Sequence, residues 1–183
     1  MFYPEKSVTY GPGAVAPDEP VQTNLTEKTS LELNGYELTR LAEFDITARV
    51  LSTQNYSNGR EADLSPLDLA LGWGNMSDEV FLYHFSVSQS GRWMHWKTSD
   101  LPISKAEIIN HTANIHMIPA DDLIKDDLKD VFKGQVVHLT GYLVRVRAAD
   151  GWTWSSSMSR SDTGSRACEV FYVESVSVVK GAE

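Results

Sequence analysis

The chain has 183 residues, of which 42% are hydrophobic and 22% are charged, a balance typical of globular proteins and not of disordered ones. A chain of this length can bury enough apolar surface to fold without disulfides. Its formal net charge of −9 opposes the attraction to phosphates that supplies most non-specific nucleic-acid affinity, so nucleic acid is disfavoured as a partner. The single cysteine, Cys168, excludes an intrachain disulfide and a zinc site built from cysteines.

The first 29 residues are rich in proline, glycine and small side chains, which predicts an extended arm or tether. Residues 30–183 are predicted to form a single α+β domain. No run of 18 apolar residues occurs, so no transmembrane segment is predicted, and the N-terminus lacks the apolar core of a signal peptide. We expect the cell envelope or periplasm as the location if an N-terminal anchor has been removed, and the cytoplasm otherwise.

Alternating hydrophobic and polar residues predict strands at the start of the domain. The alternation continues on both sides of Asn34-Gly35, a dipeptide that favours the type I′ turn of a hairpin. A third strand is predicted over residues 45–52, where Ile46, Ala48 and Val50 share one face.

Helix signals follow this strand. Ser65-Pro66 predicts the start of a short helix that ends at Gly72, because serine suits the N-cap and proline the first helical position. This helix is apolar nearly all round, so we expect it to be buried, with Asp68 in its first turn. Three further helices are predicted, over residues 78–85, from residue 105 to about residue 111 or 114, and over residues 121–132.

The rest of the chain again predicts strands, over residues 135–147, 152–159 and 168–179, with a hairpin turn at Asp150-Gly151. Gly141 inside the first of these strands indicates a bulge of the kind that small barrels need. The predicted fold class is therefore α+β: a curled antiparallel sheet or small open barrel, with three to four short helices inserted between N- and C-terminal strands. The C-terminal part is similar in rhythm to oligonucleotide/oligosaccharide-binding barrels, a likeness of fold that does not imply function.

His111 and His116 are the candidate catalytic residues, because they interrupt an apolar run in which a plain helix needs no polar group. Their spacing places them about 140° apart on a continuous helix, so they converge only if the helix ends between them. In the alternative interpretation, these histidines and Asn114 bond backbone groups in a link between two helices and brace the interior. No carboxylate is fixed beside them by spacing, so neither a metal nor a cofactor is predicted.

Five tryptophans suit either core packing or a wall on which a ligand stacks. The candidate ligand-binding residues are Arg92, Trp93, His95, Trp96, Trp152 and Trp154. A groove with this composition would suit an anionic or sugar-like ligand, whereas core packing of the same side chains is the alternative.

Other groups are assigned structural roles. The sequence Asp162-Thr163-Gly164 matches the motif of aspartic proteases but lacks the apolar strand and the second copy that this chemistry needs, so a turn is predicted. No base is placed beside Cys168, so a buried, unreactive thiol is predicted. Four carboxylates lie near the first predicted helix in the sequence and could form an acidic pocket: Asp63, Asp68, Asp78 and Glu79. For Asp68 and Glu79, a position in the first turn of a helix is a sufficient explanation, because negative charge is favourable there.

The segments ALGWGNMSD, SGRWMHWK, NHTANIHMIPA and RSDTGSRACE resemble a group of uncharacterised bacterial proteins, over about residues 61–174. The resemblance implies an exported or membrane-anchored protein and supplies no activity or catalytic residue. We therefore expect an envelope-associated binding or interaction domain for an unknown protein or small molecule. The alternatives are a histidine-dependent or metal-dependent hydrolase-like enzyme, and a structural subunit whose arm docks on another subunit.

Overall fold

The computed structural model describes residues 5–159 and 168–181. In this part of the chain the strands are β1 (Val21–Asn24), β2 (Ser30–Leu33), β3 (Tyr36–Asn55), β4 (Leu67–Gly72), β5 (Phe85–Ser90), β6 (Trp93–Thr98), β7 (Thr112–Pro119), β8 (Val136–Arg147), β9 (Thr153–Ser155) and β10 (Glu169–Lys180). The α-helices are α1 (Glu79–Leu82), α2 (Lys105–Asn110) and α3 (Asp122–Asp130), and the 3-10 helices are η1 (Arg60–Asp63) and η2 (Gly74–Ser77).

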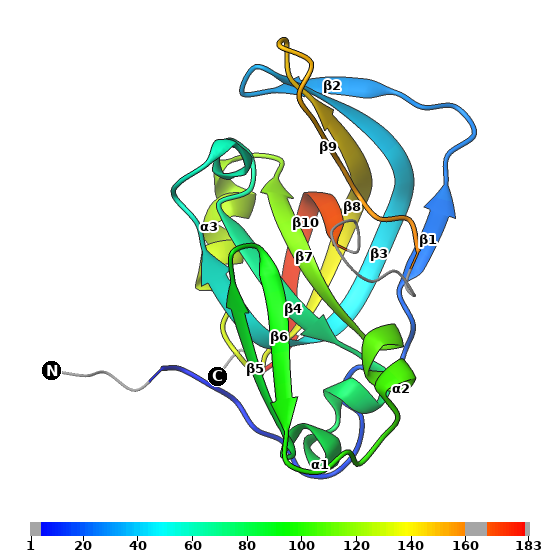
Figure 1. Cartoon of the computed structure of the whole chain (residues 1–183), viewed down its shortest axis with the longest axis vertical. Coiled ribbons are helices and arrows are strands. Elements are labelled where there is room, and N and C mark those ends of the chain that lie inside the picture. Colours follow the sequence, from blue (N-terminus) through cyan, green and yellow to red (C-terminus); the bar gives the residue numbers. More distant parts are fainter. Residues whose placement is uncertain (1–4, 160–167, 182–183) are drawn as a thin grey trace, which may run out of the picture.

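The main sheet curls until its two ends meet (Figure 1). β3 pairs with β4, β4 with β7, β7 with β10 and β10 with β8, and β8 pairs back with β3. The β7–β10 pair is parallel and the others in the ring are antiparallel. β1, β2 and β9 extend this ring, which is barrel-like without being a regular barrel. The predicted α+β class, with a curled sheet and short inserted helices, is confirmed.

The two dipeptide turn signals are confirmed. Asn34 and Gly35 have φ angles of 51° and 83°, as a type I′ turn requires, and they join β2 to β3. Asp150-Gly151 lies in the turn between β8 and β9. The strand predicted over residues 45–52 is not separate but forms the middle of the long strand β3.

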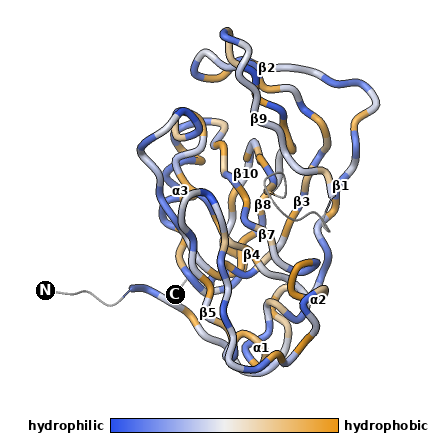
Figure 2. The backbone as a smooth tube through the Cα atoms, in the orientation of Figure 1, coloured by the Kyte–Doolittle hydropathy of each residue, from blue (hydrophilic) through white to orange (hydrophobic). Residues whose placement is uncertain are grey.

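The core fills the inside of the ring. Within this core, Phe44 of β3 and Phe171 of β10 meet edge to face, with ring centroids 5.0 Å apart. Side chains from β4, β7 and β8 surround them, including Leu69, Ile115 and Leu139. Figure 2 shows that hydrophobic residues recur along the strands of the ring. This packing fixes the register of β4 against β7, and that register positions the cavity described below.

The helix predicted from Ser65 to Gly72 is wrong, because this segment forms strand β4. All its residues are buried, since β4 lies between β3 and β7 and is covered on both faces. A strand buried on both faces shows a continuous apolar run without alternation, and such a run also suits a helix. The helix-start role expected for Asp68 is wrong for the same reason.

The link predicted between two helices around His116 is also wrong. α2 ends at Asn110, and the next residues form β7, a strand inside the ring. The helix predicted over residues 78–85 is shorter than expected, because β5 begins at Phe85. Asp78 caps this helix by accepting a hydrogen bond from the Val80 amide.

The N-terminal segment packs along its own domain. The Val8 amide donates to the Lys133 carbonyl at 3.1 Å, and Ala16 is 2% exposed beside Ser77, whose hydroxyl accepts from the Ala16 amide. Further along, β1 pairs with β3. Among the described residues, no helix is both long and apolar enough to cross a bilayer.

Gly141 lies where two strands approach closely. It pairs with Val173 of β10, and the next pair joins Thr140 to Ser175, so Glu174 is the extra residue of the predicted bulge. A Cβ atom on Gly141 would lie 1.9 Å from the Tyr172 carbonyl oxygen.

We therefore expect Gly141→Ala to lower the free energy of unfolding by about 2–4 kcal/mol, because backbone must move to admit the methyl group. Urea denaturation measures this. The matched control is Gly11→Ala, since a Cβ atom there has nothing within 4 Å. Equal stability of the two variants would show that the close approach is not present.

Candidate functional site

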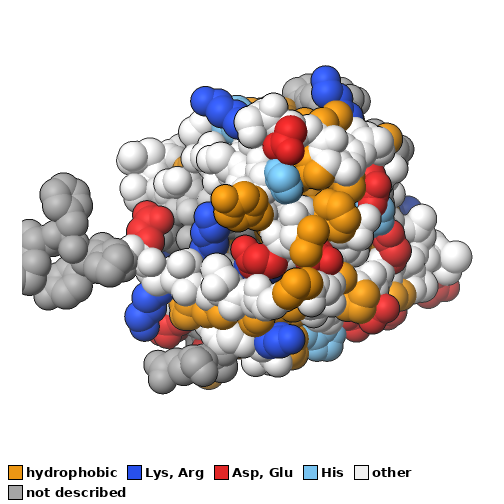
Figure 3. All heavy atoms as spheres, turned by 90° about the horizontal axis from the view of Figure 1, so that it is seen from below, with side chains coloured by type: hydrophobic (Ala, Val, Ile, Leu, Met, Phe, Trp, Pro, Cys, Tyr) orange, Lys and Arg blue, Asp and Glu red, His pale blue; other side chains and the backbone are white. Residues whose placement is uncertain are grey.

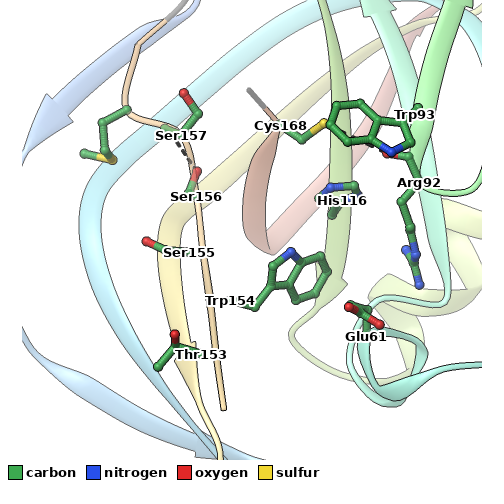
Figure 4. Close-up of a pocket in the computed structure, with 11 residues that line it drawn as sticks. Glu61, Arg92, Trp93, His116, Thr153, Trp154, Ser155, Ser156, Ser157 and Cys168 are labelled. Carbon is green, nitrogen blue, oxygen red and sulfur yellow. Dashed lines mark hydrogen bonds between the residues drawn. The ribbon is translucent and has the colours of Figure 1, made fainter. Parts of the chain in front are cut away.

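A cavity of about 690 Å³ opens beside β7 in the described part of the chain. Its walls come from the β3–β4 link, the tip of the β5–β6 hairpin, β7, β9 and the residues after β9 (Figure 4). The lining includes a carboxylate, a guanidinium, an imidazole, a thiol and two indoles, from Glu61, Arg92, His116, Cys168, Trp93 and Trp154. Residues 153 and 155–157 add hydroxyl groups.

The strand period of two places polar side chains under this cavity. Leu67 and Leu69 of β4 point into the core, so Asp68 between them faces the other way. Asp68 pairs directly with His116 across the two strands. Asn114, two residues before His116, shares the same face of β7.

Asp68 is fully buried and is surrounded by polar partners. Its Oδ1 atom lies 2.7 Å from Arg92 Nη1 and 2.9 Å from His116 Nδ1, and Asn114 Nδ2 donates to its Oδ2 atom at 3.3 Å. The His116 contact has the distance of an ion pair, but not the angles of a hydrogen bond. Since an unpaired buried charge is costly, these contacts are what allow a carboxylate to remain inside the fold.

Arg92 holds the β5–β6 hairpin against β4. Gly91 and Arg92 form the tip of the hairpin with φ angles of 57° and 70°, and the left-handed region costs a long side chain about 1–2 kcal/mol. The contacts of the guanidinium offset this cost. Besides its ion pair with Asp68, the guanidinium donates to the Ser65 carbonyl at 2.7 Å and lies 4.0 Å from the centre of the Tyr56 ring. The φ angles of Gly91 and Arg92 are those of a two-residue type I′ turn, with Arg92 at the position that glycine usually takes.

Trp154 forms a rigid part of the wall. Its ring centroid lies 5.0 Å from that of His116 and 6.3 Å from that of Trp152. Figure 4 shows Trp154 pointing toward His116, with Trp93 near Cys168 on the same side of the cavity. Trp93 comes from a different hairpin and keeps 39% of its surface exposed. Two separate hairpins therefore present flat apolar surfaces at one cavity.

Three of the six candidate ligand-binding residues line the cavity: Arg92, Trp93 and Trp154. Trp96 lies on the other face of β6 and packs against Phe85, with ring centroids 5.9 Å apart. His95 is exposed and bonds within its own hairpin. Trp152 lies under the guanidinium of Arg60, at 5.3 Å. The structure thus places these three outside the lining.

The two candidate histidines lie apart, because His111 is the C-cap residue of α2 and His116 lies within β7. His116 lines the cavity, whereas His111 Nδ1 lies 2.8 Å from the Glu107 carbonyl and its Nε2 lies 3.1 Å from Glu19. Glu19 also accepts from the Trp73 indole at 3.1 Å. His111 therefore contacts the N-terminal segment and takes no part in the cavity.

The acidic pocket considered for four carboxylates is not formed. Asp78 caps α1, Glu79 pairs with Arg49 at 2.6 Å, and Asp63 accepts from the Tyr36 hydroxyl at 2.6 Å. Within residues 5–159 and 168–181, no group of three histidine, cysteine or carboxylate side chains is placed to hold a metal ion. The Asp162-Thr163-Gly164 sequence lies outside the described residues.

Burial raises the pKa of the Cys168 thiol to about 11. The thiol is therefore protonated at neutral pH, and the thiolate forms only as the pH rises toward 11. We expect iodoacetamide to modify Cys168 about 100-fold more slowly than a cysteine in an unstructured peptide at pH 8, with the rate rising about tenfold per pH unit up to the pKa. Mass spectrometry of the alkylated protein measures this, and equal rates at pH 8 would contradict it.

Sequence reasoning missed Asp68, Asn114 and Glu61 as members of one site. The available signal was a charged residue inside a short apolar run bounded by Pro66 and Gly72, a pattern that a buried strand with a partnered charge would also produce. The register that joins Asp68 to His116 could not be derived from this signal.

The opposite end of the molecule has a different character. Figure 3 shows this face from below, with hydrophobic side chains lying between acidic and basic ones. Val80 and Tyr83 of α1 are exposed at 49% and 85%.

No family model matches the chain, and neither a curated protein nor a solved structure matches it.

Proposed function

We propose that this protein is a binding domain, without catalytic activity, that holds a small polar ligand in the cavity beside β7. The observation that carries the proposal is a cavity of about 690 Å³, walled by Trp93 and Trp154 and placed over a paired, buried cluster of charges. Small-molecule sites are of this size and combine apolar walls with a few fixed polar groups.

The position of the cavity in the ring also supports binding. β4 and β7 are the second and third strands of the ring in chain order, and the β3–β4 link, β9 and the residues after β9 reach the same cavity. Oligonucleotide/oligosaccharide-binding barrels hold ligands at the corresponding strands and loops. This is an analogy of fold, so it supports the place of binding and not the identity of the ligand.

A screen by isothermal titration tests the proposal. The classes are neutral sugars, peptides, nucleotides and small organic acids, each titrated to about 10 mM so that weak binding is detected. We expect one class to bind saturably with one site per chain and to change the tryptophan fluorescence. Absence of binding by every class would contradict the proposal.

A second candidate function is a histidine-dependent hydrolase, because His116 lies at the cavity wall 2.9 Å from a buried carboxylate. Two features favour binding instead. Asp68 is shared with Arg92, and no hydrogen bond joins His116 to a hydroxyl or thiol group of a described residue. Mass spectrometry of the incubated ligand decides: cleavage that His116→Gln abolishes would favour the hydrolase, and intact ligand favours binding.

The cell envelope is the location that we propose for this binding domain, and this part of the proposal rests on the resemblance alone. The alternative of a structural subunit required an arm that docks on another chain. Residues 5–24 instead contact their own domain, through Val8, Ala16 and β1. This arrangement supports a domain that binds its ligand by itself.

A further inference from the structure

We infer that the ligand of this cavity is an uncharged saccharide of about disaccharide size, and that Glu61 disfavours acidic sugars. This inference rests on the proposed function and names the ligand class of the same site.

The aromatic walls suit the apolar face of a sugar ring. Trp154 packs against both His116 and Trp152, with ring centroids 5.0 and 6.3 Å away, so its indole is ordered before any ligand arrives. Trp93 reaches the cavity from the β5–β6 hairpin and remains 39% exposed. A flat ring with C–H groups on its face would cover these indoles while its rim stays hydrogen-bonded to polar groups.

Hydroxyl groups lie at the same cavity. Thr153 and Ser155 line it, and their side chains point to the side of β9 opposite to Trp154, as Figure 4 shows; neither hydrogen-bonds to another described residue. Ser156, by contrast, donates to the Ser157 carbonyl at 2.7 Å and accepts from the Val170 amide at 3.1 Å, which fixes the strip of chain after β9. The lining therefore offers free hydroxyl groups along one face of β9 and an indole on the other, so a polyhydroxylated molecule can bond to this edge of the cavity while its ring covers Trp154.

The charges of the described lining disfavour an anion. Within that lining Arg92 supplies the only guanidinium or ammonium group, and Asp68 neutralises it at 2.7 Å. Both terminal nitrogens of Arg92 are engaged, because Nη1 also lies 3.1 Å from the Ser65 hydroxyl and Nη2 donates to the Ser65 carbonyl. Glu61 adds a carboxylate that pairs with no described cation. From the described residues, an acidic sugar would meet this carboxylate without gaining a free cation.

The test compares matched sugars. Cellobiose, maltose and N,N′-diacetylchitobiose are titrated calorimetrically into the full chain, each beside its derivative in which a terminal CH₂OH group is oxidised to a carboxylate. We expect at least one neutral disaccharide to bind about tenfold or more tightly than its acidic derivative. Glu61→Gln should reduce this ratio to about threefold or less, and Glu27→Gln, at an exposed position away from the cavity, should leave it unchanged.

The outcomes separate this inference from the proposed function. An acidic derivative that binds as tightly as its neutral parent overturns the inference, and so does a ratio that Glu61→Gln leaves unchanged. Binding of another ligand class at Trp154, with no disaccharide bound, also overturns it but leaves the proposed function standing. If no class binds, both fail.

Discussion

Replacing Asp68 with alanine is expected to lower the free energy of unfolding by about 3–5 kcal/mol, because it leaves a largely buried guanidinium without its counter-charge. The Arg92 side chain is 17% exposed and its carboxylate partner is fully buried. His116 and Asn114 lose a contact in the same change. Urea denaturation of both proteins, followed by circular dichroism, measures the difference.

A double-mutant cycle with Arg92→Met sharpens this result. Each single variant leaves one charge unpaired, whereas the double variant leaves none, so its loss of stability should be smaller than the sum of the two. The control is Asp45→Ala, because Asp45 and its partner His138 are exposed at 54% and 38%, and the loss of this pair should hardly change the free energy of unfolding. If Asp68→Ala unfolds like this control, the buried cluster does not exist as described.

Replacing Trp154 with alanine is expected to weaken binding of the cavity ligand by about 30-fold or more, the effect typical of a central aromatic contact. The indole lines the cavity and orders His116, so the change removes both a stacking surface and its support. Isothermal titration with the ligand found by the screen measures the loss.

The matched control for this variant is Trp96→Ala. Trp96 packs against Phe85 on the other face of β6 and lies outside the lining. Its replacement should leave the affinity within about twofold of the original, since rim and remote positions contribute little. Equal losses from the two variants would place the ligand somewhere other than this cavity.

Features with local causes were predicted well from the sequence. The turns at Asn34-Gly35 and Asp150-Gly151 depend on backbone conformations that few residue pairs adopt, so the dipeptides were sufficient signals. The bulge at Gly141 was predicted for a similar reason, because only glycine fits against the Tyr172 carbonyl. The antiparallel pairing around these turns follows from them.

β4 could not be predicted in this way. Its residues include three leucines and an alanine, good helix formers, and Ser65-Pro66 is a normal helix start. What decides the structure is the position of the segment between β3 and β7, which covers both of its faces. Tertiary packing therefore overrode local propensity, and the roles expected for Asp68 and His116 changed with it.

The site was predicted in part. Arg92, Trp93 and Trp154 were chosen for their chemistry and do line the cavity. Side chains of β6 alternate between two faces, so Trp93 and Trp96 lie on opposite faces of the strand. The neighbouring sequence does not show which of the two faces packs against the rest of the domain. Asp68 and Arg92 are 24 positions apart in the sequence, so their ion pair forms only when the β5–β6 hairpin packs against β4.

The most direct test of the central claim, that the cavity beside β7 holds a ligand, is a titration followed in the indole region of ¹H–¹⁵N spectra. On addition of a neutral disaccharide, the signals of Trp93 and Trp154 should shift saturably. The signal of Trp73, which is 1% exposed and bonded to Glu19, should stay in place. Shifts confined to tryptophans outside the lining, or no shift with any ligand class, would contradict the account.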